Sequence, residues 1–193
     1  KVTNTYNNFK HRIKFNFLRA INKMVGHNNK QHAGFKNQIQ FNKKNEILLK
    51  EEMEFIENYL AFETERLEDR CAITFNCTIA DSEIKIEPLL FFPLIENAFK
   101  HGTNTMDDCF VKIDVMMKEN VLQVSIENKI VKHLKPSTHS GIENVKKRLQ
   151  LFYPGKHNLQ MKERDGDYFV DLEIELHSKG AVNKLANRID ESR

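Results

Sequence analysis

The spacing of apolar residues changes several times along this chain, and those changes constrain its fold more than any other feature of the sequence. Apolar residues recur every three or four positions from residue 49, which predicts one long helix that runs to about Arg66. Alternating apolar residues at positions 73, 75 and 77 then predict a strand. From Pro88 an almost wholly apolar stretch predicts a second helix, which ends at Gly102.

The second half of the chain alternates in the manner of paired strands. Apolar residues at every second position predict strands around 111–115 and 122–126, joined by a tight turn. After an aperiodic loop over 128–140, we expect a third helix that stops at Pro154, and then strands over 159–163 and 168–176. This order of elements predicts an α/β (α+β) fold, a two-layer sandwich of one mixed sheet with helices on one face.

The composition is that of a soluble protein with a sizeable core. Of the 193 residues, 40% are hydrophobic and 30% are charged, which fits one domain with a short helical appendage. The longest apolar run, from Leu89 to Ile95, is too short to span a bilayer, and no signal peptide is visible. The three cysteines lack the spacing of a metal site, so we expect reduced thiols in the core.

The N-terminal region is strongly basic. Residues 1–47 carry ten Lys and Arg residues against a single acidic residue, Glu46. Such a region can bind nucleic acid or an anionic membrane surface, or it can simply be a solvated helical face. Nucleic acid is the least favoured partner, because no pattern of interleaved basic and aromatic residues recurs. An apolar stripe over residues 9–25 predicts a helix there that needs a partner, such as a second copy of the chain.

The segment 88–102 places polar side chains directly after a buried stretch of helix. Asn97 and Lys100 are three residues apart, and Asn97 and His101 are four apart, so the three share one helix face. An amide oxygen that can coordinate a hard cation, beside an ammonium that can meet phosphate, suits a Mg-nucleotide site. The alternative is an ordinary amphipathic helix end, with two cations placed favourably on the helix dipole.

Three motifs in this order resemble the LytS/YehU-type sensor histidine kinases of the GHKL ATPase superfamily. "PLLFFPLIENAFKHG" is similar to the N box of that family, "LLKEEMEFIENYLAFETERLEDR" to the helix that leads into its ATPase domain, and "SGIENVKKRLQLFYPGKH" to its second glycine box. The resemblance covers about residues 48–176. It implies a Bergerat-type ATP-binding domain there and a helical dimerisation and phosphoacceptor-like region over 1–47. The polar composition of residues 177–193 predicts a flexible tail.

The resemblance also implies roles for individual residues. Asn97 matches the Mg-coordinating residue, with Glu96 as its acidic neighbour in the catalytic pair. Hydrolytic relatives place a water-activating glutamate where this chain has Pro93, which favours a kinase over an ATPase. The nucleotide-binding residues implied by the match are Asn97, Lys100, His101, Glu127, Gly141, Asn144 and Arg148, and the implied cofactors are ATP and Mg²⁺.

The sequence departs from the family at three places. The first glycine box is replaced by residues 127–130, which contain no glycine, so Glu127 would read the adenine amino group in place of an aspartate. The second box keeps only Gly141. Each lost glycine adds a Cβ where the backbone should approach the nucleotide. At the phosphoacceptor position the alignment places Asn16, and an asparagine has no ring nitrogen that can accept a phosphoryl group.

Two functions are therefore open. The first is a sensor histidine kinase of a two-component phosphorelay, which passes phosphate from Mg-ATP to a histidine and then to a response regulator. It implies a homodimer on the cytoplasmic side of the inner membrane, whose membrane helices lie outside this chain. The second is a pseudokinase or scaffold module with a degenerate ATP site and no phosphoacceptor histidine. An ATPase or chaperone-like activity is disfavoured by Pro93.

Overall fold

The computed structural model describes residues 46–79, 83–103, 109–131 and 140–176. The helix predicted over 9–25, the phosphoacceptor position at Asn16 and the tail expected over 177–193 lie outside these residues, so those expectations stay predictions. The helices, strands and core predicted between residues 48 and 176 lie almost wholly within them.

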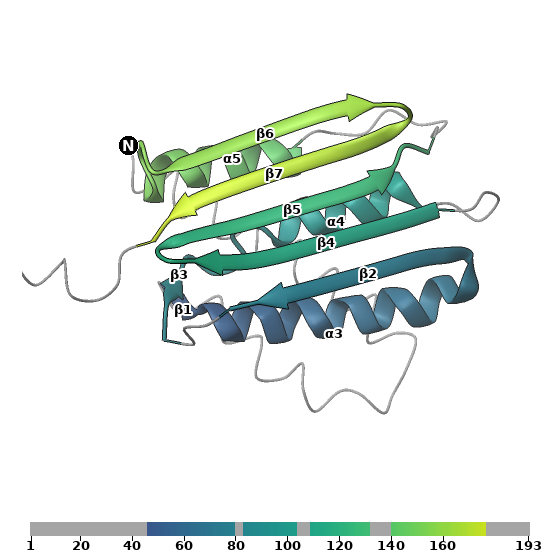
Figure 1. Cartoon of the computed structure of the whole chain (residues 1–193), viewed down its shortest axis with the longest axis horizontal. Coiled ribbons are helices and arrows are strands. Elements are labelled where there is room, and N and C mark those ends of the chain that lie inside the picture. The colour runs from purple at the N-terminus through teal and green to yellow at the C-terminus, as the bar shows by residue number, and fades with distance from the viewer. Residues whose placement is uncertain (1–45, 80–82, 104–108, 132–139, 177–193) are drawn as a thin grey trace, which may run out of the picture.

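One five-stranded sheet forms the front layer of the molecule (Figure 1). Its strand order is β2-β4-β5-β7-β6. β2 runs parallel to β4, and the other neighbouring strands are antiparallel, which confirms the predicted mixed sheet. The strands are β2 (Cys71–Thr78), β4 (Cys109–Lys118), β5 (Val121–Lys129), β6 (His157–Arg164) and β7 (Asp167–Glu175).

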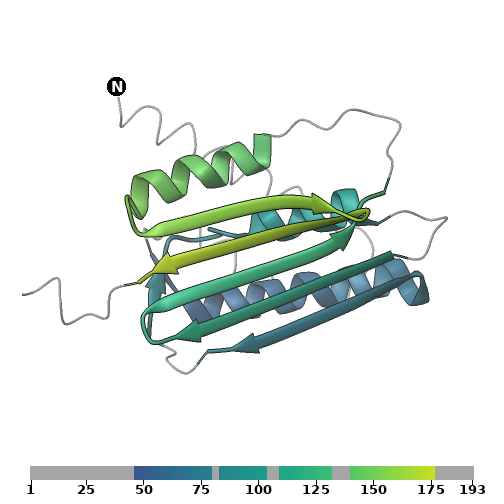
Figure 2. The ribbon, with the colours of Figure 1, turned by 45° about the horizontal axis from the view of Figure 1, so that its top comes forward.

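Three helices cover one face of this sheet and leave the other face open (Figures 1 and 2). They are α3 (Leu49–Leu67), α4 (Phe92–Gly102) and α5 (Ser140–Phe152). The alternation of the strands turns Val111, Ile113 and Val115 of β4 toward the helices, where all three are buried. The hydrophobic core therefore lies between the layers, and the two-layer sandwich predicted from the sequence is confirmed.

The second helix begins later than the sequence predicted. Pro88 does not open α4, because residues 88–91 form a turn and the helix starts at Phe92, with Pro93 in its first turn. Leu89 in this turn has a φ of 53°, a left-handed conformation that costs a non-glycine residue about 1 kcal/mol or more. A short antiparallel pair, β1 (Ile47–Leu48) with β3 (Lys85–Ile86), lies just before this turn and was not predicted.

The cysteines follow the sequence prediction only in part. All three are free thiols, and Cys71 and Cys109 are buried as opposite partners on β2 and β4. Cys77 is exposed, so the prediction of a core thiol is wrong there, because β2 is an edge strand and is less well covered toward its C-terminal end. No helix within the described residues is long and apolar enough to cross a membrane.

Candidate nucleotide site at the end of the sheet

Asn97, Lys100 and His101 lie on the less buried side of α4. The opposite side, including Leu94, Ile95 and Ala98, is buried in the core. Asn97 is half-buried, and its amide has no hydrogen-bond partner among the described residues, whereas Lys100 is exposed. The backbone carbonyl of His101 accepts a hydrogen bond of 3.1 Å from the N–H of Val131. The last turn of α4 is thus tied to the chain that follows β5.

Glu96 faces α3. Its carboxylate is close enough to the Tyr59 hydroxyl to help raise the pKa of that group, although burial is the main cause and Glu63 contributes more. The Tyr59 ring packs edge-to-face against Phe92 and Phe99, with ring centroids 5.0 and 5.6 Å away. Glu96 and Asn97 are adjacent in sequence but about 100° apart around the helix, so Glu96 lies beside α3 while Asn97 stays available.

Asn128, at the end of β5, is a candidate site residue that the sequence analysis missed. Its side chain points to the helix layer and is 1% exposed. The amide nitrogen donates to the carbonyl of Lys129 at 2.9 Å, but Oδ1 has no hydrogen-bond partner. A buried acceptor without a donor costs about 1–3 kcal/mol, so this oxygen is suited to a ligand N–H. In the sequence, the apolar residues Leu122, Val124 and Ile126 alternate, and residue 128 is the next position in the same phase. This pattern could have identified Asn128 as an inward-facing residue.

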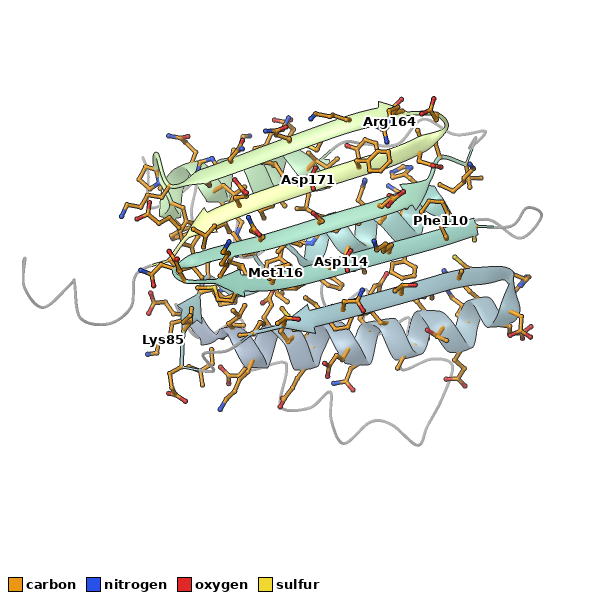
Figure 3. All side chains as sticks on the ribbon, viewed as in Figure 1. Lys85, Phe110, Asp114, Met116, Arg164 and Asp171 are labelled. Atoms are coloured by element: carbon orange, nitrogen blue, oxygen red, sulfur yellow. The ribbon has the colours of Figure 1, made fainter. Side chains whose placement is uncertain are left out.

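The structure does not bring Glu127 together with these residues. Ser125 and Glu127 are two positions apart on β5 and therefore share a face of the sheet. The Ser125 hydroxyl donates to Asp171, and the two cross-strand partners of Ser125, Asp114 on β4 and Asp171 on β7, stand on the open face on either side of β5 (Figure 3). Glu127 accordingly lies on the face opposite α4, between Lys112 and Phe169. Successive side chains of a strand point to opposite faces of the sheet. Asn128, the residue after Glu127, therefore faces the site.

The first turns of α5 lie over the same end of the sheet. Tyr168 of β7 is the direct cross-strand partner of Asn128. Burial and Glu163 raise the pKa of Tyr168, while Lys146 of α5 is near enough to lower it in part. On the same helix, Gly141 precedes Lys146 by five residues and Asn144 precedes it by two. A Cβ on Gly141 would meet no atom within 4 Å, and the half-buried Asn144 amide has no hydrogen-bond partner in the described part of the chain.

Arg148 is placed away from this end of the sheet. Its side chain is buried, and its guanidinium donates to the carbonyls of Pro88 and Leu89 in the turn before α4. The resemblance implied that Arg148 contacts the nucleotide, but its donors in this conformation serve the protein backbone. We therefore do not include it among the residues that would touch a ligand.

The arrangement fits a magnesium nucleotide better than a metal ion alone. Within the described residues, no group of three His, Cys, Asp or Glu side chains is placed to hold a metal. Asn97 offers one amide oxygen, Lys100 an exposed ammonium, Asn128 a buried acceptor, and Gly141 an open position in the first turn of a helix. Mg²⁺ keeps several of its ligands as water and phosphate oxygens, so a single amide oxygen suffices on the protein side.

The fold defined by these elements is that of a histidine kinase catalytic domain. The histidine kinase domain of the blue-light activated kinase EL346 from Erythrobacter litoralis superposes with a TM-score of 0.52 at 14% identity, over 88% of this chain and 92% of that one. The histidine kinase AdeS of Acinetobacter baumannii has a TM-score of 0.50 at 16% identity, over 85% and 84% of the two chains. A histidine kinase from Burkholderia phymatum STM815 has a TM-score of 0.50 at 10% identity, over 88% and 97%.

In sequence, the chain is distantly similar to LytS sensor histidine kinases. It is 26% identical over 165 residues to the sensor protein LytS of Staphylococcus haemolyticus, a match that covers 75% of this chain and 27% of the relative. The identity to LytS of Staphylococcus saprophyticus is 26% over 159 residues, with the same coverage of 75% and 27%. The chain thus matches 27% of the length of these two relatives. No family model matches it.

Proposed function

We propose that this chain is the ATP-binding catalytic part of a sensor histidine kinase. The observation that carries the proposal is the buried, unpartnered Oδ1 of Asn128 at the end of the sheet where α4 presents Asn97 and Lys100. A buried acceptor suits the amino group of adenine, and an ammonium suits phosphate. In this proposal the phosphoryl group passes from ATP to a histidine and then to a response regulator.

Each residue of the site has one proposed task. Asn97 would hold the Mg²⁺ ion, which neutralises phosphate charge during phosphoryl transfer. Lys100 and His101 would meet the phosphates, and Gly141 with Asn144 would bring the first turn of α5 toward them. Glu96, turned toward Tyr59, would support α4 instead of activating water, in keeping with a kinase that needs no hydrolytic base at Pro93.

The second candidate is a protein that binds the nucleotide, or only a partner, without phosphoryl transfer. Two sequence observations favour it. Asn16 occupies the position of the phosphoacceptor in the alignment with the family, and Lys129 and Ile130 carry side chains where the first glycine box would have none. The difference between the two candidates lies in the chemistry after binding, so binding and transfer must be measured separately.

The expected partners follow from the same proposal. LytS relatives are sensor proteins, so a response regulator is the proposed acceptor of the phosphate, and a second copy of the chain is the proposed partner of the N-terminal helix. The remaining length of such a sensor would hold the membrane helices and place this part on the cytoplasmic side of the inner membrane. The basic residues of 1–47 would then face anionic lipid.

Calorimetric titration with a non-hydrolysable ATP analogue, with and without Mg²⁺, tests nucleotide binding. We expect Mg-dependent binding in the micromolar range, about −8 kcal/mol, and its loss in Asn97→Ala. Asn76→Ala is the matched control. Asn76 is exposed, donates to Asp114 at 2.7 Å, and lies on the open face of the sheet, so its removal should leave binding unchanged. Absence of binding in the unaltered chain would exclude both the kinase and the nucleotide-binding form of the second candidate.

Radiolabel transfer from γ-labelled ATP separates the two candidates when binding is found. Acid-labile, base-stable label on the chain, lost in a His-to-Gln variant of its acceptor, supports the kinase. Binding without label in a purified dimer, and without label on an added response regulator, supports the second candidate. Label that appears as free phosphate at a steady rate would instead indicate an ATPase and contradict the role given to Pro93.

A further inference from the structure

The strained turn before α4 is held from two sides by buried polar side chains. The N–H of Leu89 donates to Oε2 of Glu52, on α3, at 2.6 Å. The carbonyl of Leu89 accepts a hydrogen bond of 2.5 Å from Arg148, on α5, and the same guanidinium donates to the carbonyl of Pro88. One residue with a φ of 53° is thus bound at its N–H by one helix and at its carbonyl by another.

Both side chains are buried without contact to the proposed nucleotide site. Glu52 is 0% and Arg148 is 2% exposed, and a second carboxylate, Glu87, lies 3.5 Å from the guanidinium. Burying ionisable groups costs several kcal/mol, and apolar side chains of similar size often give equal or better stability. Stability alone therefore does not account for these residues. Their hydrogen bonds instead define the positions of α3 and α5 relative to the turn before α4.

We infer that Glu52 and Arg148 are positioning residues, a clamp that fixes α3 and α5 to the turn at the start of α4. The inference rests on the proposed function and adds a set of residues that act on the site without touching it. α4 carries Asn97 and Lys100, and α5 begins with Gly141 and Asn144. The clamp connects these two helices through the turn at residues 88–89, in addition to their direct packing, so it helps to set how far the two halves of the site stand apart. It also joins them to α3, which follows the N-terminal region.

The charge state of the clamp depends on pH. Burial raises the pKa of Glu52 to about 8, although the N–H groups of Leu89 and Leu90 and the charge of Arg148 oppose the shift and Glu87 adds to it. At pH 7 the cluster therefore holds a neutral Glu52 near the paired charges of Arg148 and Glu87. Above pH 8 an ionised Glu52 adds a buried negative charge beside Arg148. Because burial disfavours the charged form of Glu52, its ionisation favours conformations in which the turn opens to water.

The test is the affinity for a non-hydrolysable ATP analogue with Mg²⁺ between pH 7.0 and 9.0, in the full chain. We expect wild-type affinity to fall roughly tenfold across this range, and affinity in Glu52→Gln, which stays neutral, to remain level. Glu54→Gln is the matched control, because Glu54 lies on α3 but is exposed. It should follow the wild-type profile. A residue that only stabilises the fold would change the melting temperature without changing this profile. Equal profiles in all three proteins would overturn the inference.

Arg148 variants give a second measure at pH 7.0. Arg148→Met removes all donors and should weaken binding about tenfold, while Arg148→Lys, which keeps one ammonium, should lose less. If the Met variant does not fold, the Lys variant decides the outcome, since it keeps a donor and the charge. Unchanged affinity in a folded Arg148→Lys and a folded Arg148→Met would contradict the clamp.

Hydrogen–deuterium exchange separates the failure of the inference from the failure of the proposed function. In the ligand-free chain, Arg148→Lys should raise amide exchange both in residues 87–95 and in the first turns of α5, and leave the β6–β7 hairpin unchanged. If the wild type binds no nucleotide but this linked change is seen, the proposed function fails and the clamp stands. If exchange rises only next to residue 148, the clamp fails whether or not nucleotide binds.

Discussion

Gly102 and Asn128 are in such close contact that no side chain fits between them. A Cβ built on Gly102 would lie 2.7 Å from the amide nitrogen of Asn128 and 2.8 Å from its Cβ. The last turn of α4 can therefore approach the end of β5 only because residue 102 is a glycine. This contact places the polar face of α4 beside the buried acceptor of Asn128.

Replacing Gly102 with alanine should separate these two elements. The added Cβ meets atoms close to the backbone of β5 instead of the flexible end of a long side chain, so α4 must shift. We expect a loss of about 1–3 kcal/mol in the free energy of unfolding, measured with urea, as for other overpacked sites. Nucleotide affinity should fall as well. A stability within a few tenths of a kcal/mol of wild type would show that α4 does not depend on this contact.

Gly141→Ala should have the opposite effect on stability. Nothing lies within 4 Å of the new Cβ, and alanine favours a helix over glycine by up to about 1 kcal/mol. The free energy of unfolding should therefore stay the same or rise. Affinity for Mg-nucleotide should nevertheless fall, because the Cβ occupies the space where phosphates would approach the first turn of α5. Unchanged affinity in this variant would remove Gly141 from the proposed site.

The layers of the fold were predictable because they depend on periodicity. The alternation along β4 and the spacing along α3 report which side chains are buried, and the structure places both elements as expected. The start of α4 was not predictable. The apolar residues from Pro88 to Phe91 are buried in a turn, and the same apolar pattern would suit a buried helix. The residues that hold the turn, Glu52 and Arg148, are distant in sequence.

The candidate site was predictable where its residues share one helix. Asn97, Lys100 and His101 lie on one face of α4, as the three- and four-residue spacing predicted. The residues contributed by other elements were harder. Matching the first glycine box by sequence selected Glu127, whereas the phase of β5 turns Asn128 inward. The resemblance assigned Arg148 to the nucleotide. The tertiary structure is needed to see that its guanidinium binds two backbone carbonyls instead.

The three cysteines should differ sharply in reactivity. Cys71 and Cys109 are buried, and burial together with the neighbouring Cys109 thiol raises the pKa of Cys71 to about 12. Partial burial and Glu57 raise the pKa of Cys77 as well, but Cys77 is the exposed one of the three, so we expect it to react with a thiol reagent first. Titration of the native protein should show one fast thiol, and titration in denaturant three. Cys77→Ser should abolish the fast phase, and a fast phase that remained would contradict the burial of the other two.

The stability of the protein should fall as the pH rises from slightly acid to slightly alkaline. Burial raises the pKa of Glu52 from 4.5 to about 8 in the folded state, so the folded protein holds a proton that the unfolded chain releases. The contribution is fully present below pH 4.5 and is lost as the pH rises through about 8. The slope reaches at most about 1.4 kcal/mol per pH unit for one such group. Urea unfolding between pH 5.5 and 8.5 measures it.

Glu52→Gln should flatten this dependence. Its amide oxygen can still accept the hydrogen bond from Leu89, and it carries no charge at any pH. The variant should therefore differ least from wild type at pH 5.5 and exceed it in stability most at pH 8.5, while Glu54→Gln, on the exposed face of α3, keeps the wild-type slope. The tyrosines whose pKa values are raised, Tyr59, Tyr153 and Tyr168, ionise above 10 and do not contribute in this window. Equal slopes in the two variants would show that Glu52 is already ionised in the folded protein, held by Arg148 as a buried ion pair.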